Sequence, residues 1–327
     1  MIEPYEEHSQ HEIDLTKPVE LPLDQNPAAV YLASLTSERS RRTMSNALRT
    51  VVSLLTYRPL EDVTQDHMLQ MPWHGLRYQH TAAVRALLID EYSPATVNRI
   101  LSALRGVIKE AWRLGYISAE QYQRAVDIAN VKAQTLPTGR ELTAGEISAL
   151  VETCKVDPSP AGIRDVAIIG LLYTCGLRRS ELVAIEHRDF DPKEGRLMIR
   201  RGKGRKQRVV YVRGGALKAL KDWIAMSPDH AGPIFTPVLK NGKIQFGGMV
   251  SQSIYDMLKK RGLQANVADF SPHDLRRTFV SDMLERGVDI ATVADIAGHS
   301  SVDTTRRYDR RPEEGRKQAA DRLHFPY

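Results

Sequence analysis

Cysteine is scarce in this chain, and a long apolar run is absent. Two cysteines among 327 residues exclude a disulfide framework and favour a reducing compartment. The longest largely apolar run, residues 166–177, is shorter than about 20 residues, the length that a helix needs to cross a bilayer. The first residues are acidic, with no apolar stretch behind them, so we expect no secretory signal or transit peptide. These features predict a cytoplasmic protein with no membrane partner.

The overall composition is that of an ordinary globular protein. Hydrophobic residues make up 42% of the chain and charged residues 26%, a balance that excludes a wholly disordered polypeptide. A length of 327 residues exceeds that of one average domain and fits two.

Charge of one sign gathers in two places, in a chain whose formal net charge is +6. The acidic cluster lies in residues 1–20 and comprises Glu3, Glu6, Glu7, Glu12, Asp14 and Glu20. The basic cluster lies in residues 196–213 and comprises Arg196, Arg200, Arg201, Lys203, Arg205, Lys206, Arg208 and Arg213. The basic cluster favours a phosphate-rich partner. A solvated hairpin explains it equally well, so charge alone leaves both interpretations open.

Turn-forming residues divide the chain into four parts. Residues 1–24 are polar and acidic and contain three prolines, so we expect a loosely ordered tail. Residues 25–128 carry apolar stripes at helical spacing. Residues 129–140 have turn formers and no stripe, which favours a linker. The second domain is therefore expected to span residues 141–327.

The first domain includes a helix that begins near Ser93-Pro94, where proline is tolerated in the first turn. Three bases, Arg105, Lys109 and Arg113, stand one turn apart beside the apolar stripe of this helix. Their aliphatic stems can simply cover apolar surface while their charges stay in water. The alternative, that they bind the backbone of DNA, is equally open.

The second domain is predicted to be mainly helical around a small sheet. Thr143 and Glu146 have the spacing of a capping box that opens a helix. Two β-prone runs, residues 197–200 and 209–212, flank a glycine-containing turn and predict a hairpin. Helical spacing returns after Pro272. The whole chain is thus expected to be mainly α with a small β-sheet.

Five segments of the second domain hold polar residues suited to chemistry: 174–182, 202–204, 273–276, 298–300 and 304–308. Taken singly, each is more often surface, turn or packing than a site. Together they lack the paired carboxylates that hold catalytic cations and the Cys and His density of a zinc site. What remains is metal-free attack on a phosphodiester, with guanidiniums on the charged oxygens and tyrosine as the nucleophile. No metal or other cofactor is expected.

Three runs, in this order, resemble the tyrosine recombinase family, also called the phage integrase family. They are Tyr-Thr-Cys-Gly-Leu-Arg-Arg-Ser-Glu-Leu at 173–182, Ser-Pro-His-Asp-Leu-Arg-Arg-Thr-Phe at 271–279, and Ala-Gly-His-Ser-Ser-Val-Asp-Thr-Thr-Arg-Arg-Tyr at 297–308. Residues 141–310 resemble the family closely, and residues 25–127 resemble its core-binding domain more loosely. The resemblance implies a SAM-like helical core-binding domain that binds DNA, followed by an α+β catalytic domain.

The resemblance also implies a role for each polar position. Tyr308 would attack the scissile phosphate, and Arg178 and Arg276 would bind its non-bridging oxygens. Lys203, in the glycine turn, would be the general acid for the departing 5′-oxygen. His273 would take the proton of the phenol or bind the phosphate.

Two further positions complete the implied site. His299 would donate another hydrogen bond, and Glu181 would orient catalytic groups without reacting, although an ordinary helix salt bridge explains Glu181 equally well. The hairpin bases Arg205, Lys206 and Arg208 match no catalytic position of the family. We expect them to neutralise DNA phosphates or to be solvated.

The implied function is site-specific DNA recombination of the simple two-domain, Xer-like type. Strands of duplex DNA sites would be cut and rejoined through a 3′-phosphotyrosyl bond and a Holliday junction. The enzyme would be nucleoid-associated and act as a homotetramer, or as a heterotetramer with a related recombinase, with accessory DNA-bending or directionality proteins as possible partners. Two alternatives stay open: a type IB topoisomerase, and a catalytically inactive DNA-binding relative.

Overall fold

The computed structural model describes residues 14–132, 139–200, 207–227, 231–299, 301–306 and 308. The chain divides into two compact units, Met1–Thr135 and Leu136–Tyr327. The described part is mostly helical with one three-stranded sheet, which confirms the predicted fold class. None of its helices has both the length and the apolar character that a bilayer crossing requires.

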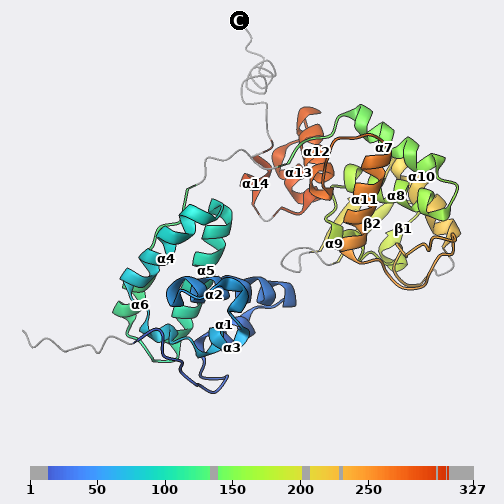
Figure 1. Cartoon of the computed structure of the whole chain (residues 1–327). Helices are drawn as coiled ribbons and strands as arrows, with labels where there is room; N and C mark the ends of the chain where they lie inside the picture. The colour runs from blue at the N-terminus through green and yellow to red at the C-terminus, as the bar shows by residue number, and fades with distance from the viewer. Residues whose placement is uncertain are drawn as a thin grey trace, which may run out of the picture. The chain divides into compact units, whose positions relative to one another are not determined.

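The first unit is a helical bundle built around its longest helix, α5 (Figure 1). Val97, Leu101, Leu104 and Ile108 of this helix have no exposed surface, so the stripe read from the sequence is the buried face. Helices α1, α2, α4 and α6 all contact α5. The helices are α1 (Pro27–Ser34), α2 (Glu38–Thr56), α3 (Gln65–Gln70), α4 (Tyr78–Glu91), α5 (Pro94–Arg113) and α6 (Ala119–Val126), with 3-10 turns at Leu60–Asp62 and Trp73–Gly75.

Part of the stretch expected to be a loose tail packs on the first unit. The backbone N–H of Val19 donates to the carbonyl of Gln70 at 2.8 Å, and Leu15 packs against the core of the unit. At the other end of the unit, Asn98 exchanges two hydrogen bonds with the backbone of Val131. The first residues of the predicted linker are therefore held against α5.

The second unit is built around α8, a largely buried helix that contacts α7, α10 and α12 (Figure 1). The predicted capping box is confirmed, since the Thr143 side chain accepts from the backbone N–H of Glu146 and α7 begins at Ala144. The helices are α7 (Ala144–Val156), α8 (Pro160–Thr174), α9 (Arg179–Leu182), α10 (Gly214–Met226), α11 (Ser251–Gln264), α12 (Pro272–Glu285), α13 (Ile290–Ala297) and α14 (Val302–Arg306), with a 3-10 turn at His187–Asp189.

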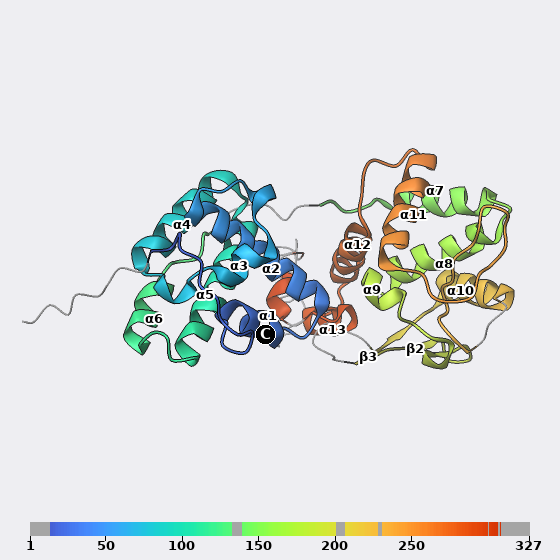
Figure 2. The ribbon, with the colours of Figure 1, turned by 60° about the horizontal axis from the view of Figure 1, so that its bottom comes forward.

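The small sheet is antiparallel in the order β1-β2-β3. Strands β2 (Arg196–Ile199) and β3 (Arg208–Tyr211) each lie one residue earlier than the sequence predicted. Strand β1 (Phe190–Asp191), which was not predicted, pairs with β2. The turn at 201–206 lies outside the described residues. Figure 2 shows β3 beside α13, which it contacts.

A buried ion network ties α11 to the start of α8. The guanidinium of Arg261, which is 1% exposed, binds Asp157 at 2.6 Å and Asp165 at 2.8 Å. Burial acts to raise the pKa of Asp157, but the hydrogen bonds from Arg261 and Ser159 outweigh it and lower the pKa to about 2. A buried guanidinium without its carboxylates would be costly.

Asp157→Asn is expected to lower the free energy of unfolding of the second unit by about 1–3 kcal/mol at pH 7. Because the folded pKa is about 2 and the ordinary value is 3.8, this contribution is complete above pH 4 and is lost as the pH falls towards 2. Hydrogen exchange of the α11 amides measures the difference. A difference that stays the same from pH 7 to pH 2 would show that the charge of Asp157 contributes nothing.

Candidate active site

Arg276 lies on the first turns of α12, with its side chain almost fully buried. The helix is opened by Pro272 and by reciprocal bonds between Ser271 and Asp274. One guanidinium nitrogen, Nη1, donates to the carbonyl of Gly176 at 2.5 Å. The other, Nη2, is buried and has no hydrogen-bond partner among the described residues. Burial and the charge of Arg178 lower the pKa of Arg276 to about 9. An unpaired buried cation of this kind is suited to an anionic ligand.

Arg178 immediately precedes α9 and is fixed by two different elements. Its Nη1 donates to Oε1 of Glu181 at 2.8 Å, and its Nη2 donates to the carbonyl of Gly298 at 2.7 Å. The backbone N–H of Arg178 also donates to Oε2 of Glu181. The side chain of Arg178 is partly exposed, so it is held in place without being sealed from solvent.

Glu181 is a buried carboxylate shared by two arginines. It accepts from Arg178 and also from both terminal nitrogens of Arg208, at 3.0 and 2.8 Å. Burial acts to raise its pKa, but the hydrogen bonds from Arg208 and Arg178 outweigh this and lower the pKa below 4.5. Glu181 is therefore ionised at neutral pH and orients guanidiniums, which fits the orienting role that the sequence left open.

The surroundings of Arg208 differ from those predicted from the sequence. A solvated or phosphate-binding base was predicted, but the side chain is 12% exposed and engaged with Glu181. Its Nε donates to the carbonyl of Ile296 at 2.8 Å. The prediction of a DNA contact is corrected for this residue, because its donors are directed into the protein. The other hairpin residues with predicted roles, Lys203, Arg205 and Lys206, lie outside the described residues.

His299 and Tyr308 lie next to each other, on the segment that follows α13. Their rings are stacked with centroids 6.3 Å apart. The Nδ1 of His299 is 2.7 Å from the hydroxyl of Thr305, which fixes the ring. Burial and the charges of Arg276 and Arg178 lower the pKa of His299 to about 4. The imidazole is therefore neutral at pH 7, and one ring nitrogen can donate a hydrogen bond.

Tyr308 is held through its ring and its backbone. Its N–H donates to the carbonyl of Thr305 at 2.9 Å, and the guanidinium of Arg277 lies 5.3 Å from its ring centroid. Arg277 in turn donates to the carbonyl of Gly139. The side chain of Arg277 thus connects Gly139, near the start of the second unit, to the ring of Tyr308.

His273 lies three residues before Arg276 on α12 and is exposed. The surrounding protein removes part of its water, and Arg276 and Arg277 add like charge, so its pKa is lowered from 6.5. A neutral, accessible imidazole can accept a proton. The structure thus brings His273, Arg276, Arg178, Glu181, His299 and Tyr308 to one region of the second unit.

Sequence reasoning missed several residues that support this region. Gly176 provides the carbonyl for Arg276 in a left-handed backbone conformation (φ +58°), and a Cβ there would lie 2.4 Å from the ring of Phe279. Thr305 orients His299, and Arg277 contacts Tyr308. Gly176 and Thr305 stand inside the recognised runs, but their contacts join segments more than five residues apart, which residue spacing does not reveal.

The predicted DNA-contacting bases of α5 have different surroundings. Arg105 is directed to the chain itself, donating to the carbonyl of Ile128 and the side chain of Asn130. Lys109 is exposed. Arg113 is exposed and paired with Glu110 at 2.9 Å. Lys109 and Arg113 are therefore accessible to a phosphate group. Arg105 instead holds residues 128–130 in place.

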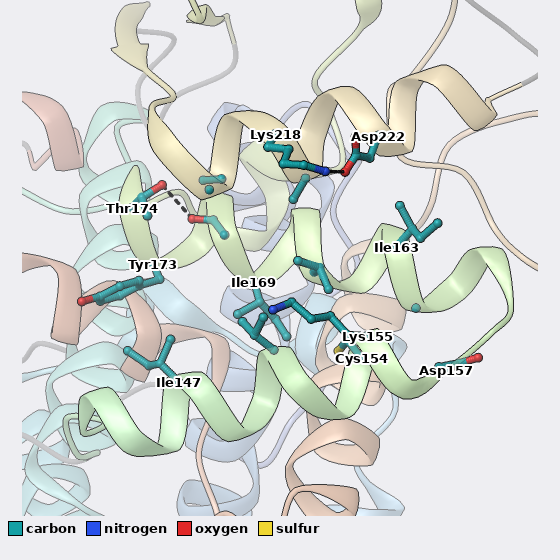
Figure 3. Close-up of a pocket in the computed structure, with 17 residues that line it drawn as sticks. Ile147, Cys154, Lys155, Asp157, Ile163, Ile169, Tyr173, Thr174, Lys218 and Asp222 are labelled. Atoms are coloured by element: carbon teal, nitrogen blue, oxygen red, sulfur yellow. Dashed lines mark hydrogen bonds and ion pairs between the residues drawn. The ribbon is translucent and has the colours of Figure 1, made fainter.

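A separate groove of about 630 Å³ lies between α7, α8 and α10 (Figure 3). Its walls are apolar, with Ile147, Cys154 and Ile169 among the residues that line it, and a Lys218–Asp222 ion pair on α10. None of the described catalytic candidates lines this groove. The candidate active site is therefore a surface of convergent charged groups rather than an apolar pocket.

The family model of the phage integrase family matches residues 140–314. The tyrosine recombinase XerA of Pyrococcus furiosus is 31% identical over 235 residues, which cover 72% of this chain and 76% of that protein. The solved Tn1549 transposon integrase, in complex with transposon right-end DNA, matches with a TM-score of 0.67 at 16% identity over 93% of this chain and 99% of its own. A lambda integrase tetramer bound to a Holliday junction matches with a TM-score of 0.62 at 15% identity, over 89% of this chain and 77% of its own. The structural matches concern the fold, whereas the family model and the sequence identity show that this chain belongs to the phage integrase family of tyrosine recombinases.

Proposed function

We propose that this chain is a site-specific DNA recombinase that cuts and rejoins duplex DNA through a covalent 3′-phosphotyrosyl intermediate. One observation carries the chemistry: the buried Nη2 of Arg276, which has no hydrogen-bond partner in the part of the chain that the structure describes, lies in the same region as Arg178, His299 and Tyr308. A phosphodiester oxygen satisfies that nitrogen, and two guanidiniums neutralise the charge of a pentacoordinate transition state.

Cleavage proceeds by in-line displacement at phosphorus. The phenolic oxygen of Tyr308 forms a bond to the phosphorus while the bond to the 5′-oxygen breaks. His273 accepts the phenolic proton, and Lys203 gives a proton to the departing 5′-oxygen. His299 donates a hydrogen bond to the phosphate. The reverse reaction, with a different 5′-hydroxyl, reseals the strand and exchanges partners.

Residues 25–128 of the first unit are proposed as the core-binding domain, with Lys109 and Arg113 of α5 against the DNA backbone. Residues 141–327 are proposed as the catalytic domain, with Arg205 and Lys206 on DNA phosphates. Because a lambda integrase is seen as a tetramer on a Holliday junction, we propose that this chain also acts as a tetramer. The tetramer is either homomeric or shared with a related recombinase, and accessory DNA-bending or directionality proteins are further candidate partners.

Strand exchange between two sites is the test of this function. Sites are first mapped by trapping covalent complexes on genomic DNA, and two copies are then placed in direct repeat on a supercoiled plasmid. We expect two recombinant circles, formed also in excess EDTA, because arginines supply the positive charge. Tyr308→Phe is the control and should give none.

The two rival functions give other outcomes. A type IB topoisomerase would relax the plasmid without exchanging strands, and an inactive relative would bind the sites without forming adducts. Strict dependence on magnesium would contradict the proposed chemistry, whereas a mild effect would not, since divalent ions also screen the charge of DNA.

A further inference from the structure

Arg208 is the first residue of β3 and joins three separate elements. Its two terminal nitrogens bind the carboxylate of Glu181 on α9 as a fork. Its Nε binds the carbonyl of Ile296 in the last turn of α13. A planar guanidinium makes such a bidentate contact with defined geometry, which a lysine cannot reproduce. The side chain therefore fixes β3, α9 and the end of α13 relative to one another.

The carboxylate of Glu181 is only 1% exposed and needs both of its arginine partners. Arg178 supplies one side-chain nitrogen and its backbone N–H to this carboxylate. Arg208 supplies the other two donors. Without Arg208, the buried carboxylate of Glu181 would lose two of its hydrogen bonds. The carboxylate and Arg178 would then rearrange, which would change the geometry of Arg178.

The turn after α13 is held between the same two arginines. Gly298 adopts a left-handed conformation (φ +64°), and a Cβ on it would lie 2.7 Å from Nη1 of Arg208. On its carbonyl side, the turn accepts a hydrogen bond from Nη2 of Arg178 at 2.7 Å. The guanidinium of Arg178 therefore lies at the C-terminal end of α13, where the helix dipole is negative. His299 is the next residue in the chain, so its position follows from this packing.

We propose that Arg208 is a positioning residue for DNA cleavage, which holds Arg178 and His299 in place through Glu181 and the Gly298 turn. The inference rests on the proposed function, since it concerns groups that would contact the scissile phosphate. Arg208 itself does not touch DNA in this account. Its loss should therefore slow the chemical step and leave the electrostatics of DNA binding unchanged.

The experiment compares Arg208→Ala and Arg208→Lys with Arg213→Ala. Arg213 is a matched control, because it lies just after the same strand and is exposed. Single-turnover cleavage of a suicide substrate is measured at saturating DNA, together with DNA affinity at several salt concentrations. We expect both Arg208 variants to cleave about 10- to 100-fold more slowly, with wild-type affinity and salt slope. Arg213→Ala should cleave at the wild-type rate.

A direct phosphate contact predicts a different pattern. Arg208→Ala would then bind more weakly with a salt slope flattened by about one unit, while Arg208→Lys would behave like wild type. That pattern, or wild-type cleavage by both variants, would overturn the proposal. If Arg208→Ala fails to fold, Arg208→Lys carries the comparison, with its melting temperature as the check on folding.

Two further measurements separate positioning from general loss of structure. In an Arg178→Ala background, Arg208→Ala should slow cleavage less than it does in wild type, because one of the two residues that it positions is gone; fully additive losses would contradict the proposal. Added guanidinium should partly restore cleavage by Arg208→Ala. It should not restore cleavage by the double variant that carries both Arg178→Ala and Arg208→Ala. If the wild-type protein forms no adduct at all, the proposed function is wrong. If the wild-type protein is active and the Arg208 variants cleave at the same rate, only the positioning role of Arg208 is wrong.

Discussion

Tyr308→Phe is expected to abolish covalent protein–DNA adducts while leaving the fold and DNA binding intact. The substitution removes the phenolic oxygen that would bond to phosphorus. It keeps the ring, which stacks on His299 and lies under the guanidinium of Arg277. It also keeps the backbone bond to Thr305. Adducts that resist denaturation, measured on a gel with cognate DNA, report the result.

DNA affinity is the control for this prediction, because a variant that no longer binds would also form no adduct. Tyr211→Phe serves as a matched substitution, since Tyr211 is an exposed tyrosine of the same unit with no proposed role, and it should form adducts normally. Adducts of undiminished yield from Tyr308→Phe would mean that another residue is the nucleophile.

Lys203→Ala is expected to slow cleavage by about 10²- to 10⁴-fold, the usual range for the loss of a general acid. The 5′-oxygen is a poor leaving group without a proton, and the lysine is proposed to supply it. When the bridging 5′-oxygen of the substrate is replaced by sulfur, the sulfur departs without needing a proton. Single-turnover cleavage of that substrate by Lys203→Ala should therefore be close to the wild-type rate.

Arg276→Ala is the contrast for the sulfur experiment. This variant loses a buried cation that stabilises charge on the phosphate, and sulfur at the bridging position does not replace that charge. Sulfur should therefore leave the Arg276→Ala defect at full size. If the sulfur substrate fails to rescue Lys203→Ala, then Lys203 is not the general acid and the hairpin makes only a backbone contact.

Local signals in the sequence predicted the helices, whereas the members of the candidate site were predicted from the resemblance to the tyrosine recombinase family. The Thr143–Glu146 capping box and the Ser93-Pro94 helix start depend on residues within one turn, and both are confirmed. His273 and Arg276 share a helix face because they are three residues apart. Strand β1 is only two residues long, too short to show a β-prone pattern, and it was missed.

Long-range contacts account for what the sequence did not predict. Arg208 looked like its basic hairpin neighbours, but β3 lies against α13 and places the guanidinium against Glu181, 27 residues away in the chain. The contact of Arg277 with Tyr308 spans two helices and the turns between them. A charge pattern shows that bases gather in a segment, whereas packing decides which of them face solvent.

The most direct test of the whole account is the chemical identity of the bond between protein and DNA. Wild-type protein is incubated with a suicide substrate in excess EDTA, and the trapped adduct is digested and analysed by mass spectrometry. The account predicts a single modified residue, Tyr308, esterified to a 3′-phosphate, with a free 5′-hydroxyl on the released strand. An adduct on any other residue, a 5′-phosphate linkage, or cleavage only after magnesium is added would contradict it.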